Sequence, residues 1–266
     1  MKTRLGLDAN LPVTDIVSEA IKLIWLQSGF VLSRFLPAMI ALALIDWLGQ
    51  VLYPESQSMM PILFMLVSML LGVVFAIACH RFALADSDLP VSFKWTRDHW
   101  RYLGRGVQIG LICGLVILLT MIVFGVAAPG LFMNQGEVES AITGPAIIVV
   151  LIGVMIMMYV GARLSVTLPE IAVGRPSSLK RAWQLSKGNG SRLVVVVWIV
   201  PIVLALPFMA AYALDSTLML FLGALGTYIA TLISLITLSL SYRFLTDLER
   251  ESAEGDPNSG DSGFSA

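Results

Sequence analysis

Six long runs of apolar residues, separated by shorter polar segments, dominate the chain. A helix of about 20 residues crosses a hydrocarbon layer about 30 Å thick, and each run has about that length. A helix also satisfies its own backbone hydrogen bonds, which an open strand edge in lipid does not. The pattern therefore predicts an all-α integral membrane protein with six transmembrane helices. We place the predicted spans at residues 31–52, 61–80, 107–132, 145–167, 193–213 and 217–242.

An amphipathic segment precedes every odd-numbered span. The three segments are VTDIVSEAIKLIWLQSGFVLSRF, VSFKWTRDHWRYLGRG and SSLKRAWQLSKGNGSR, and each combines aromatic residues or leucines with a glycine and a late cation. In the first and third, apolar residues recur at helical spacing, which is typical of helices lying in the headgroup layer. Ser177 is the predicted N-cap of the third helix. We therefore predict three hairpins, each preceded by a cytoplasmic interfacial amphipathic helix; gene duplication and independent hairpin insertion both account for the similarity.

Composition supports a lipid environment. Hydrophobic residues make up 57% of the 266 residues, charged residues only 13%, and the mean hydropathy is +0.85. Soluble domains carry roughly 25% charged residues, so this chain has too little polar surface for a globule in water. No cleavable signal is visible, and the first apolar run is expected to be a permanent span. We divide the chain into a cytoplasmic segment 1–13, a membrane domain 14–246 with hairpin units at about 14–89, 90–176 and 177–246, and a disordered acidic cytoplasmic tail 247–266.

All 17 lysines and arginines fall on one side of the predicted spans. The three turns on the opposite side carry only acidic charges, at Glu55, Glu137, Glu139 and Asp215. The positive-inside rule therefore places both termini in the cytoplasm, and we expect a multi-pass protein of a bacterial inner membrane. The net charge of −1 gives no overall field that would attract nucleic acid.

The cations near the predicted membrane surface are candidates for contact with anionic lipid headgroups, where each contributes about 1 kcal/mol. Tryptophans at the same level are candidates for interfacial anchors. The predicted headgroup contacts are Arg34, Arg81, Lys94, Arg97, Arg101, Arg105, Arg163, Lys180, Arg181, Lys187, Arg192 and Arg243, and the predicted anchors are Trp25, Trp95, Trp100 and Trp183. The SKGNGS stretch lacks the spacing of a nucleotide-binding loop. The mixture of aromatics and cations before span three also occurs in single-strand nucleic-acid binders, but a short segment between two spans favours the membrane surface.

Small residues and prolines mark helix packing and kinks. Gly106, Gly110 and Gly114 form one smooth face of span three, and Gly226, Ala230 and Ser234 repeat the spacing in span six. Such faces let helices approach closely within the bundle or between protomers, with a permeation groove as the alternative. Pro201 and Pro207 each remove a backbone donor from span five and predict kinks.

The sequence contains few residues in patterns that would indicate ion transport, catalysis or metal binding. Asp46 lies near the outer end of span one, His80 near the inner end of span two, and no ionisable residue lies at a convincing midplane, which argues against an ion-coupled pump. Glu170 is expected to pair with one of the arginines at the inner ends of the spans, and His99 beside Asp98 is expected to be a surface pair. Cys79 and Cys113 have no metal or redox spacing. We predict no catalytic, cofactor-binding or metal-binding residues.

Residues 164–189, LSVTLPEIAVGRPSSLKRAWQLSKGN, resemble the YciC-like integral membrane proteins, a family related to the membrane domain found beside some glycerophosphodiester phosphodiesterases. That family combines a span ending in an arginine, a proline, an amphipathic helix of the type SLKxAWxLxxGN and a further span. The matching positions here are Arg163, Pro169, Ser178, Leu179, Ala182, Trp183, Leu185, Gly188 and Asn189. The resemblance implies a fold and topology. No soluble phosphodiesterase domain is recognised in the sequence, so that activity is not implied.

Together these features favour a non-catalytic inner-membrane protein that contacts anionic lipids and organises lipid or partner proteins at the cytoplasmic surface. The alternative is a small transporter or channel for a lipid or amphiphile, which the prolines of span five and glycines of span three would favour. A third possibility is an accessory to a phosphodiesterase. The predicted partners are membrane lipids, a second copy of the chain or another membrane protein, and not nucleic acid.

Overall fold

The computed structural model describes residues 10–52, 60–84, 91, 93–127, 144–214 and 216–254, which form helices and no strands. Parts of the predicted organisation lie outside these residues: the start of the N-terminal segment, the four acidic positions Glu55, Glu137, Glu139 and Asp215, and the tail beyond Glu254. The elements in order are α1 (Val13–Leu26), α2 (Ser28–Phe30), the π-helical η1 (Val31–Phe35), α3 (Leu36–Leu52), α4 (Met60–Ala83), α5 (Arg97–Ala127), α8 (Gly144–Ser165), α9 (Thr167–Ala172), α10 (Leu179–Leu185), α11 (Gly190–Val194), the π-helical η2 (Val195–Ile199), α12 (Val200–Met209), the 3-10 segment η3 (Ala210–Ala213) and α13 (Thr217–Glu254).

Within the described residues, six helical stretches are long and apolar enough to cross a membrane, which confirms the predicted number and is what a multi-pass membrane protein requires. They cover Ser28–Leu52, Ile62–Ala83, Arg97–Gly125, Ile147–Ala172, Gly190–Ala213 and Thr217–Ser252. The last helix, α13, continues to Glu254. Residues 247–254 are therefore helical, and the prediction of a disordered tail starting at Asp247 is wrong over this stretch.

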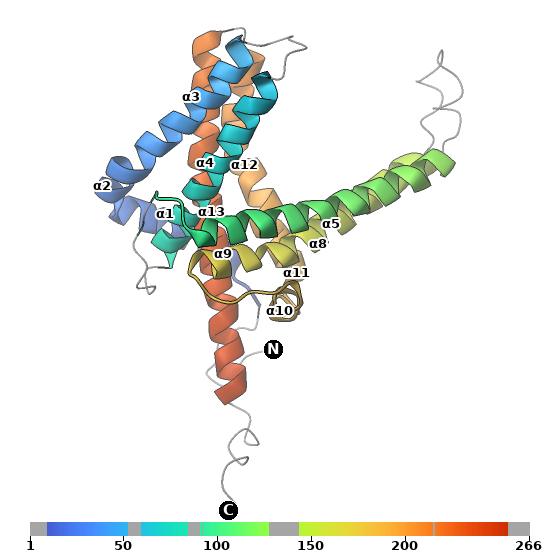
Figure 1. Cartoon of the computed structure of the whole chain (residues 1–266). Coiled ribbons are helices and arrows are strands. Elements are labelled where there is room, and N and C mark those ends of the chain that lie inside the picture. The colour runs from blue at the N-terminus through green and yellow to red at the C-terminus, as the bar shows by residue number, and fades with distance from the viewer. Residues whose placement is uncertain are drawn as a thin grey trace, which may run out of the picture.

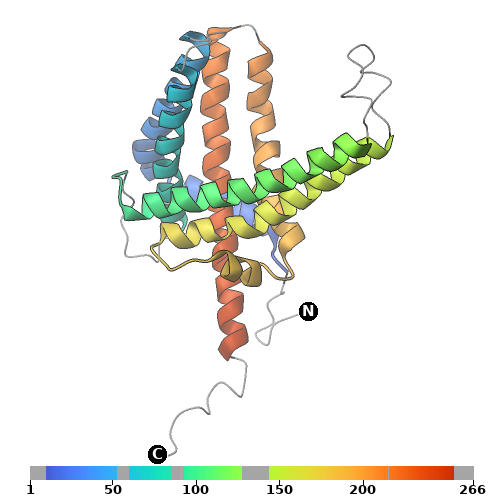
Figure 2. The same ribbon diagram turned by 45° about the vertical axis from the view of Figure 1, so that its right-hand side comes forward.

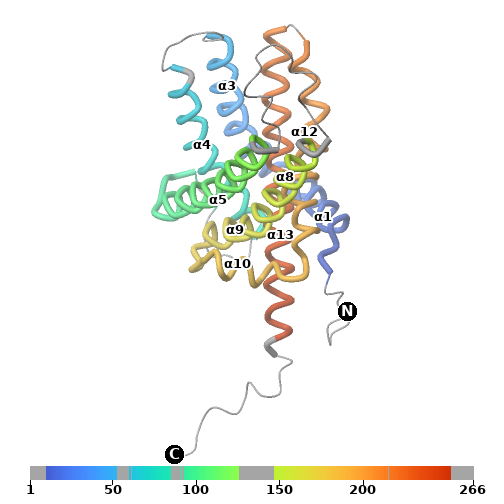
Figure 3. Tube along the Cα trace, turned by 90° about the vertical axis from the view of Figure 1, so that its right-hand side faces the viewer, coloured from blue at the N-terminus to red at the C-terminus, as the bar shows by residue number. Residues whose placement is uncertain are grey.

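The six long helices do not form one parallel bundle. Helices α3, α4, α12 and α13 run alongside one another as an upright group, in which α13 contacts the other three (Figure 1). Helices α5 and α8 pack against each other and leave this group at a steep angle (Figure 2). The α5–α8 hairpin is attached near its base, where α5 contacts α4 and α9 and where α8 contacts α10, α11 and η2 (Figure 3).

A π-helical turn lies just before a proline in two of the spans. The amide N–H of Leu36 donates to the carbonyl of Val31, and Pro37 follows. In the same way, the amide N–H of Val200 donates to Val195, and Pro201 follows. Proline lacks the N–H of the regular ladder, and a local shift to wider hydrogen bonding accommodates this loss. Of the two prolines where kinks were predicted, Pro201 follows a π turn, and Pro207 lies inside α12 shortly before the 3-10 segment η3.

The first and third hairpin units share one order of elements, but the second unit differs. In each of these two predicted units, a separate first helix and a break precede the first span, which begins with a short helix and a π turn, and the second span follows. At the second break, Gly188 has a φ of +82°, a conformation that glycine adopts without strain. In the second unit, however, α5 is continuous from Arg97 to Ala127, so the predicted separate interfacial helix before span three is wrong there.

The two separate first helices pack against the protein on one side. Ile16 and Ala20 are the buried residues of α1, and Ala182 and Leu185 those of α10. The side chain of Ser178, rather than the predicted Ser177, caps α10 by accepting a hydrogen bond from the Arg181 amide. Both helices thus bury one apolar stripe, as amphipathic helices do.

Of the two small-residue faces predicted for close packing, the face that contains Gly226 on span six meets another span, and the face on span three does not. A Cβ on Gly226 of α13 would lie 2.0 Å from Phe208 of α12, so these helices meet because the side chain is missing. By contrast, Gly106, Gly110 and Gly114 have no heavy atom within 4 Å of an added Cβ among the described residues. Within the chain, the predicted packing face of span three is therefore open.

Candidate functional site

The cations collect at one end of the upright group, which we call the basic end. It is formed by η1, the C-terminal end of α4, the first turns of α5, the last turns of α8, and α9–α11. Two of the predicted headgroup ligands at this end, Arg81 and Arg163, are buried at 5% and 7% exposure. Their burial excludes them from contact with headgroups, and that part of the prediction is wrong.

Arg81 holds the start of α5 and the end of α9 against the end of α4. Its Nε donates to the carbonyl of Ala172 at 2.8 Å, and its other nitrogen lies 3.0 Å from a carboxylate oxygen of Asp98. An arginine this buried is tolerated because both sides of its guanidinium are bonded.

Arg163 plays the same role between α8 and α10. Its Nε donates to the Ser186 hydroxyl at 2.8 Å, and a terminal nitrogen donates to the carbonyl of Trp183. The guanidinium carbon also lies 3.7 Å from the centre of the Trp183 ring. Trp183, predicted as an interfacial anchor, therefore covers a buried cation with one face of its indole.

Three further predicted headgroup ligands are engaged by protein groups. Arg105 donates to the Ser177 carbonyl at 3.0 Å, and Arg192 donates to the Leu11 carbonyl at 2.8 Å. Arg181 bonds Glu170 at 2.7 Å and Glu249 at 2.9 Å, and the hydrogen bond to Glu170 raises the pKa of its guanidinium. Glu170 thus pairs with an arginine of α10, not with one at the end of a span as expected.

The remaining predicted headgroup ligands are exposed. Arg34, Arg97, Lys180 and Lys187 form no hydrogen bond or ion pair with other residues described in the structure. Arg101 lies 3.8 Å from Asp98, at the limit of an ion pair, and Lys94 and Arg243 are exposed as well. Among the predicted anchors, Trp25 is 80% and Trp100 62% exposed, as a ring meeting the interface would be.

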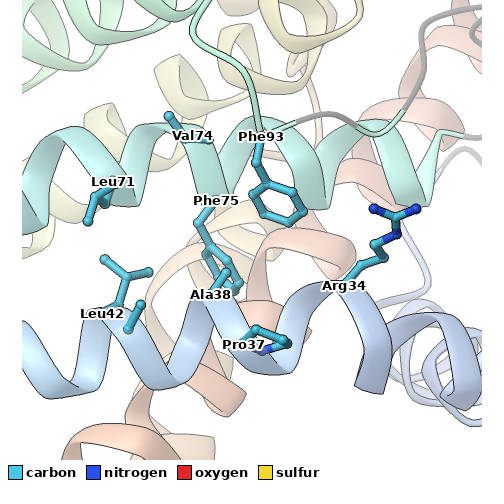
Figure 4. A pocket seen from close by; sticks show the side chains of 9 residues that line it. Arg34, Pro37, Ala38, Leu42, Leu71, Val74, Phe75 and Phe93 are labelled. Carbon is cyan, nitrogen blue, oxygen red and sulfur yellow. The ribbon is translucent and has the colours of Figure 1, made fainter.

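A hollow of roughly 300 Å³ opens between α3 and α4 at the basic end. Figure 4 shows Arg34 extending from the π turn on one side, with Phe93 beside it and Phe75 behind. We call it the Arg34 hollow, and every lining side chain that the structure describes, other than Arg34, is apolar. Its lining residues are Arg34, Pro37, Ala38, Ala41, Leu42, Leu71, Val74, Phe75 and Phe93.

A second hollow of roughly 300 Å³ lies on the other flank of α4, and its lining is entirely apolar. Trp95 and Trp100 form one wall, with their rings edge to face at 5.2 Å. We call it the Trp hollow, and its lining residues are Leu70, Leu71, Val74, Trp95 and Trp100. Leu71 and Val74 therefore border both hollows.

An aromatic cluster centred on Phe35 packs against the wall of the Arg34 hollow. The ring of Phe35 is in contact with those of Phe30, Phe75, Phe82 and Phe93 at centre-to-centre distances of 5.4–6.1 Å. Because Phe75 and Phe93 also line the hollow, its wall is part of a packed core.

Both histidines are buried. His80 is fully buried, with Nδ1 2.7 Å from the Ser239 hydroxyl and Nε2 3.1 Å from the Tyr102 hydroxyl. His99 is also fully buried, so the predicted surface pair with Asp98 is wrong. The described residues contain no group of three or more potential ligands that could hold a metal ion.

One polar contact inside the spans was not predicted from the sequence. The hydroxyl of Tyr228 on α13 donates to a carboxylate oxygen of Asp46 on α3 and lies 3.3 Å from the Ser68 hydroxyl on α4. Asp46 is separated from Tyr228 by 182 residues, and no spacing rule connects them. The Tyr228 hydroxyl therefore joins three spans, because it contacts side chains on both α3 and α4.

Comparison of the chain with protein-family models, with curated proteins and with solved structures finds no match in any of the three. The resemblance of residues 164–189 to the YciC-like proteins therefore stays a prediction. The hollows, the exposed cations and the apolar helices are the features of the structure that bear on function. Neither hollow is lined by Gly110, Pro201 or Pro207, the residues that a permeation groove was predicted to use.

Proposed function

We propose that this protein is a non-catalytic, multi-pass protein of a bacterial inner membrane that contacts anionic lipids and organises lipid or partner proteins at the cytoplasmic surface. In this proposal the basic end faces the cytoplasm, and the six apolar helices lie in hydrocarbon. The inner leaflet carries anionic headgroups, which attract cations close to the membrane.

The observation that carries the proposal is the set of exposed cations at the basic end. The side chains of Arg34, Arg97, Lys180 and Lys187 have no partner among the described residues. By contrast, protein groups bond other cations at the same end, namely Arg81, Arg105, Arg163, Arg175, Arg181 and Arg192. Exposed Trp25 and Trp100 accompany the cations of the first group. Free cations beside exposed tryptophans are what a headgroup layer accommodates.

The second candidate function is transport of a lipid or amphiphile, and the Arg34 hollow between two spans favours it. A transporter moves lipid from one leaflet to the other, whereas a lipid-contacting protein does not. Reconstitution into vesicles with labelled lipid, followed by measurement of the labelled fraction in each leaflet, separates the two functions.

The main proposal is tested with the purified full chain in nanodiscs of phosphatidylcholine alone or mixed with phosphatidylglycerol. We expect a higher melting temperature with phosphatidylglycerol, and a gain that shrinks as salt screens the charges. A variant combining Arg97→Gln, Lys180→Gln and Lys187→Gln should lose much of the gain, since each cation contributes about 1 kcal/mol. Equal melting temperatures in both lipids would contradict the proposal.

A further inference from the structure

We propose that one anionic diacyl phospholipid straddles helix α4, with its phosphate on Arg34 and one acyl chain in each of the two hollows. This inference rests on the proposed function and specifies its ligand and its site. The remaining exposed cations would contact lipid less specifically.

The two hollows are neighbours separated by a single ridge. Leu71 and Val74 lie three residues apart, so they project from the same face of α4, and both hollows use them as a wall. Two apolar hollows on either side of one ridge match the two chains of a phospholipid. At roughly 300 Å³ each, they are at the lower end of the range of about 300–1,000 Å³ for small-molecule sites.

The headgroup position follows from charge. Arg34 is the one charged side chain that lines either hollow, and it has no polar partner among the residues that the structure describes. A guanidinium presents paired donors that match a phosphate, which makes arginine better suited to this ligand than a lysine. Figure 4 shows its guanidinium at the Phe93 end of the hollow, away from Leu42 and Leu71.

A short segment crosses from one hollow to the other. Phe93 lines the Arg34 hollow and Trp95 lines the Trp hollow, so residues 93–95 connect the linings of the two hollows, and the glycerol part of the lipid would sit beside them. Tryptophan is enriched at this depth of a bilayer. Arg34 is also near the start of the span Ser28–Leu52, where a long cation reaches the headgroup layer.

The lining argues against a soluble phosphate compound. Among the described residues, no lining side chain of the Arg34 hollow other than Arg34 offers a hydrogen bond to a sugar or base, and the described lining of the Trp hollow is apolar. A buried polar ligand without hydrogen-bond partners is disfavoured. An amphiphile with one charge and long chains satisfies both parts of the site.

Native mass spectrometry of the full chain, titrated with phosphatidylglycerol, tests the headgroup position. We expect Arg34→Gln to weaken binding of the first lipid about tenfold or more, as for loss of one charge-assisted hydrogen bond. Arg34→Lys, which keeps the charge, should weaken it less. The matched control is Arg250→Gln on an exposed turn of α13, which should change binding less than twofold. Equal binding by Arg34→Gln and the native protein would overturn the inference.

Two further measurements test the chains. Ala41→Phe fills the Arg34 hollow and should weaken binding about as strongly, while Ile40→Phe, an exposed position outside the lining on the same helix, should not. Phosphatidylglycerol with a photoreactive group in mid-chain should cross-link both to residues 38–42 and to residues 95–100. Cross-linking that is confined to one hollow, or binding that excess glycerophosphate displaces, would contradict a straddling lipid.

These results also separate the inference from the function on which it rests. If phosphatidylglycerol stabilises the native protein and Arg34→Gln equally, lipid contact stands and the α4 site falls. If phosphatidylglycerol stabilises neither, the proposed function falls as well. Melting in detergent without added lipid shows whether each variant is folded before lipid is titrated.

Discussion

The guanidinium carbon of Arg163 on α8 lies 3.7 Å from the centre of the Trp183 ring on α10. The contact ties the end of the fourth span to the helix that precedes the fifth. Tyr159, one turn earlier on α8, adds its ring to the cluster, and its edge rests on Gly190, where a Cβ would lie 2.5 Å from it. The sequence of α10 resembles that of a lipid-facing helix, but its central residue Trp183 packs against the buried guanidinium of Arg163.

We expect Arg163→Ala to lower the free energy of unfolding by about 2–4 kcal/mol, since it removes the ring contact and leaves the Ser186 hydroxyl and a carbonyl without their donor. Arg163→Lys should recover part of the loss because it keeps the charge but not the fork of donors. Unfolding in mixed detergent micelles measures both variants. Arg250→Ala, on an exposed turn, is the control, and an equal effect of the control would show that Arg163 is no more than a surface charge.

Arg81 and Asp98 give a second prediction about charges that act within the protein. Arg81→Ala should destabilise the protein by about 3–5 kcal/mol, because it leaves a carboxylate and the Ala172 carbonyl unpaired next to the core. Arg101→Ala, which affects only the long 3.8 Å contact with the same carboxylate, should cost less than about 1 kcal/mol. If Arg81→Ala and Arg101→Ala lower the free energy of unfolding equally, the buried contacts of Arg81 do not stabilise the protein more than an exposed ion pair does.

The roles of these arginines could not be predicted from the sequence. The positive-inside rule counts cations in a loop, and it gives the same weight to Arg97, which is exposed, and to Arg81, which is buried. The two arginines differ because Arg81 has hydrogen-bond partners in the protein. One partner, Ala172, is 91 residues away in the chain, and the other, Asp98, is on the following helix. Such partners become visible only when the helices are packed.

The number of spans, by contrast, could be predicted because it depends on local sequence and not on the packing of the helices. Crossing hydrocarbon sets the length and apolar content of each helix, and both are properties of a local stretch of sequence. The steep angle of the α5–α8 hairpin could not be predicted, because hydropathy fixes the length of a span and not its tilt. The hairpin is placed by contacts at its base, including the hydrogen bond from the Trp198 indole to the Met158 carbonyl at 2.9 Å.

Two glycines provide a matched test of helix packing. Gly226→Ala should destabilise the protein by about 1–3 kcal/mol, because the new methyl group would overlap the ring of Phe208. Gly110→Ala adds the same group where nothing lies within 4 Å, and it should leave the fold intact. Melting temperature and particle mass in detergent check both. A smaller particle mass for Gly110→Ala would show that this open face of α5 packs against a second copy of the chain.

The hydrogen bond from Tyr228 to Asp46 is suited to a double-mutant cycle. Tyr228→Phe leaves the carboxylate in apolar surroundings without its donor, and it should cost about 1–3 kcal/mol of unfolding free energy. Adding Asp46→Leu removes the second polar partner and should restore much of the loss. Tyr212→Phe, at a more exposed ring, is expected to change stability by less than about 0.5 kcal/mol. Losses that simply add would show that the two side chains do not depend on each other.

The orientation of the chain in the membrane gives the last prediction. In the topology predicted from the sequence, all 17 lysines and arginines lie on the side of the spans that includes both termini, and the three opposite turns carry only acidic charges. A reporter that is active only in the cytoplasm should therefore be active after the C-terminus and inactive after Glu139. A reporter that works only outside the inner membrane should give the reverse pattern. If the C-terminal fusion reports the outside, the basic end faces away from the anionic cytoplasmic surface, and the attraction that would hold Arg34 and its neighbours at anionic headgroups there is lost.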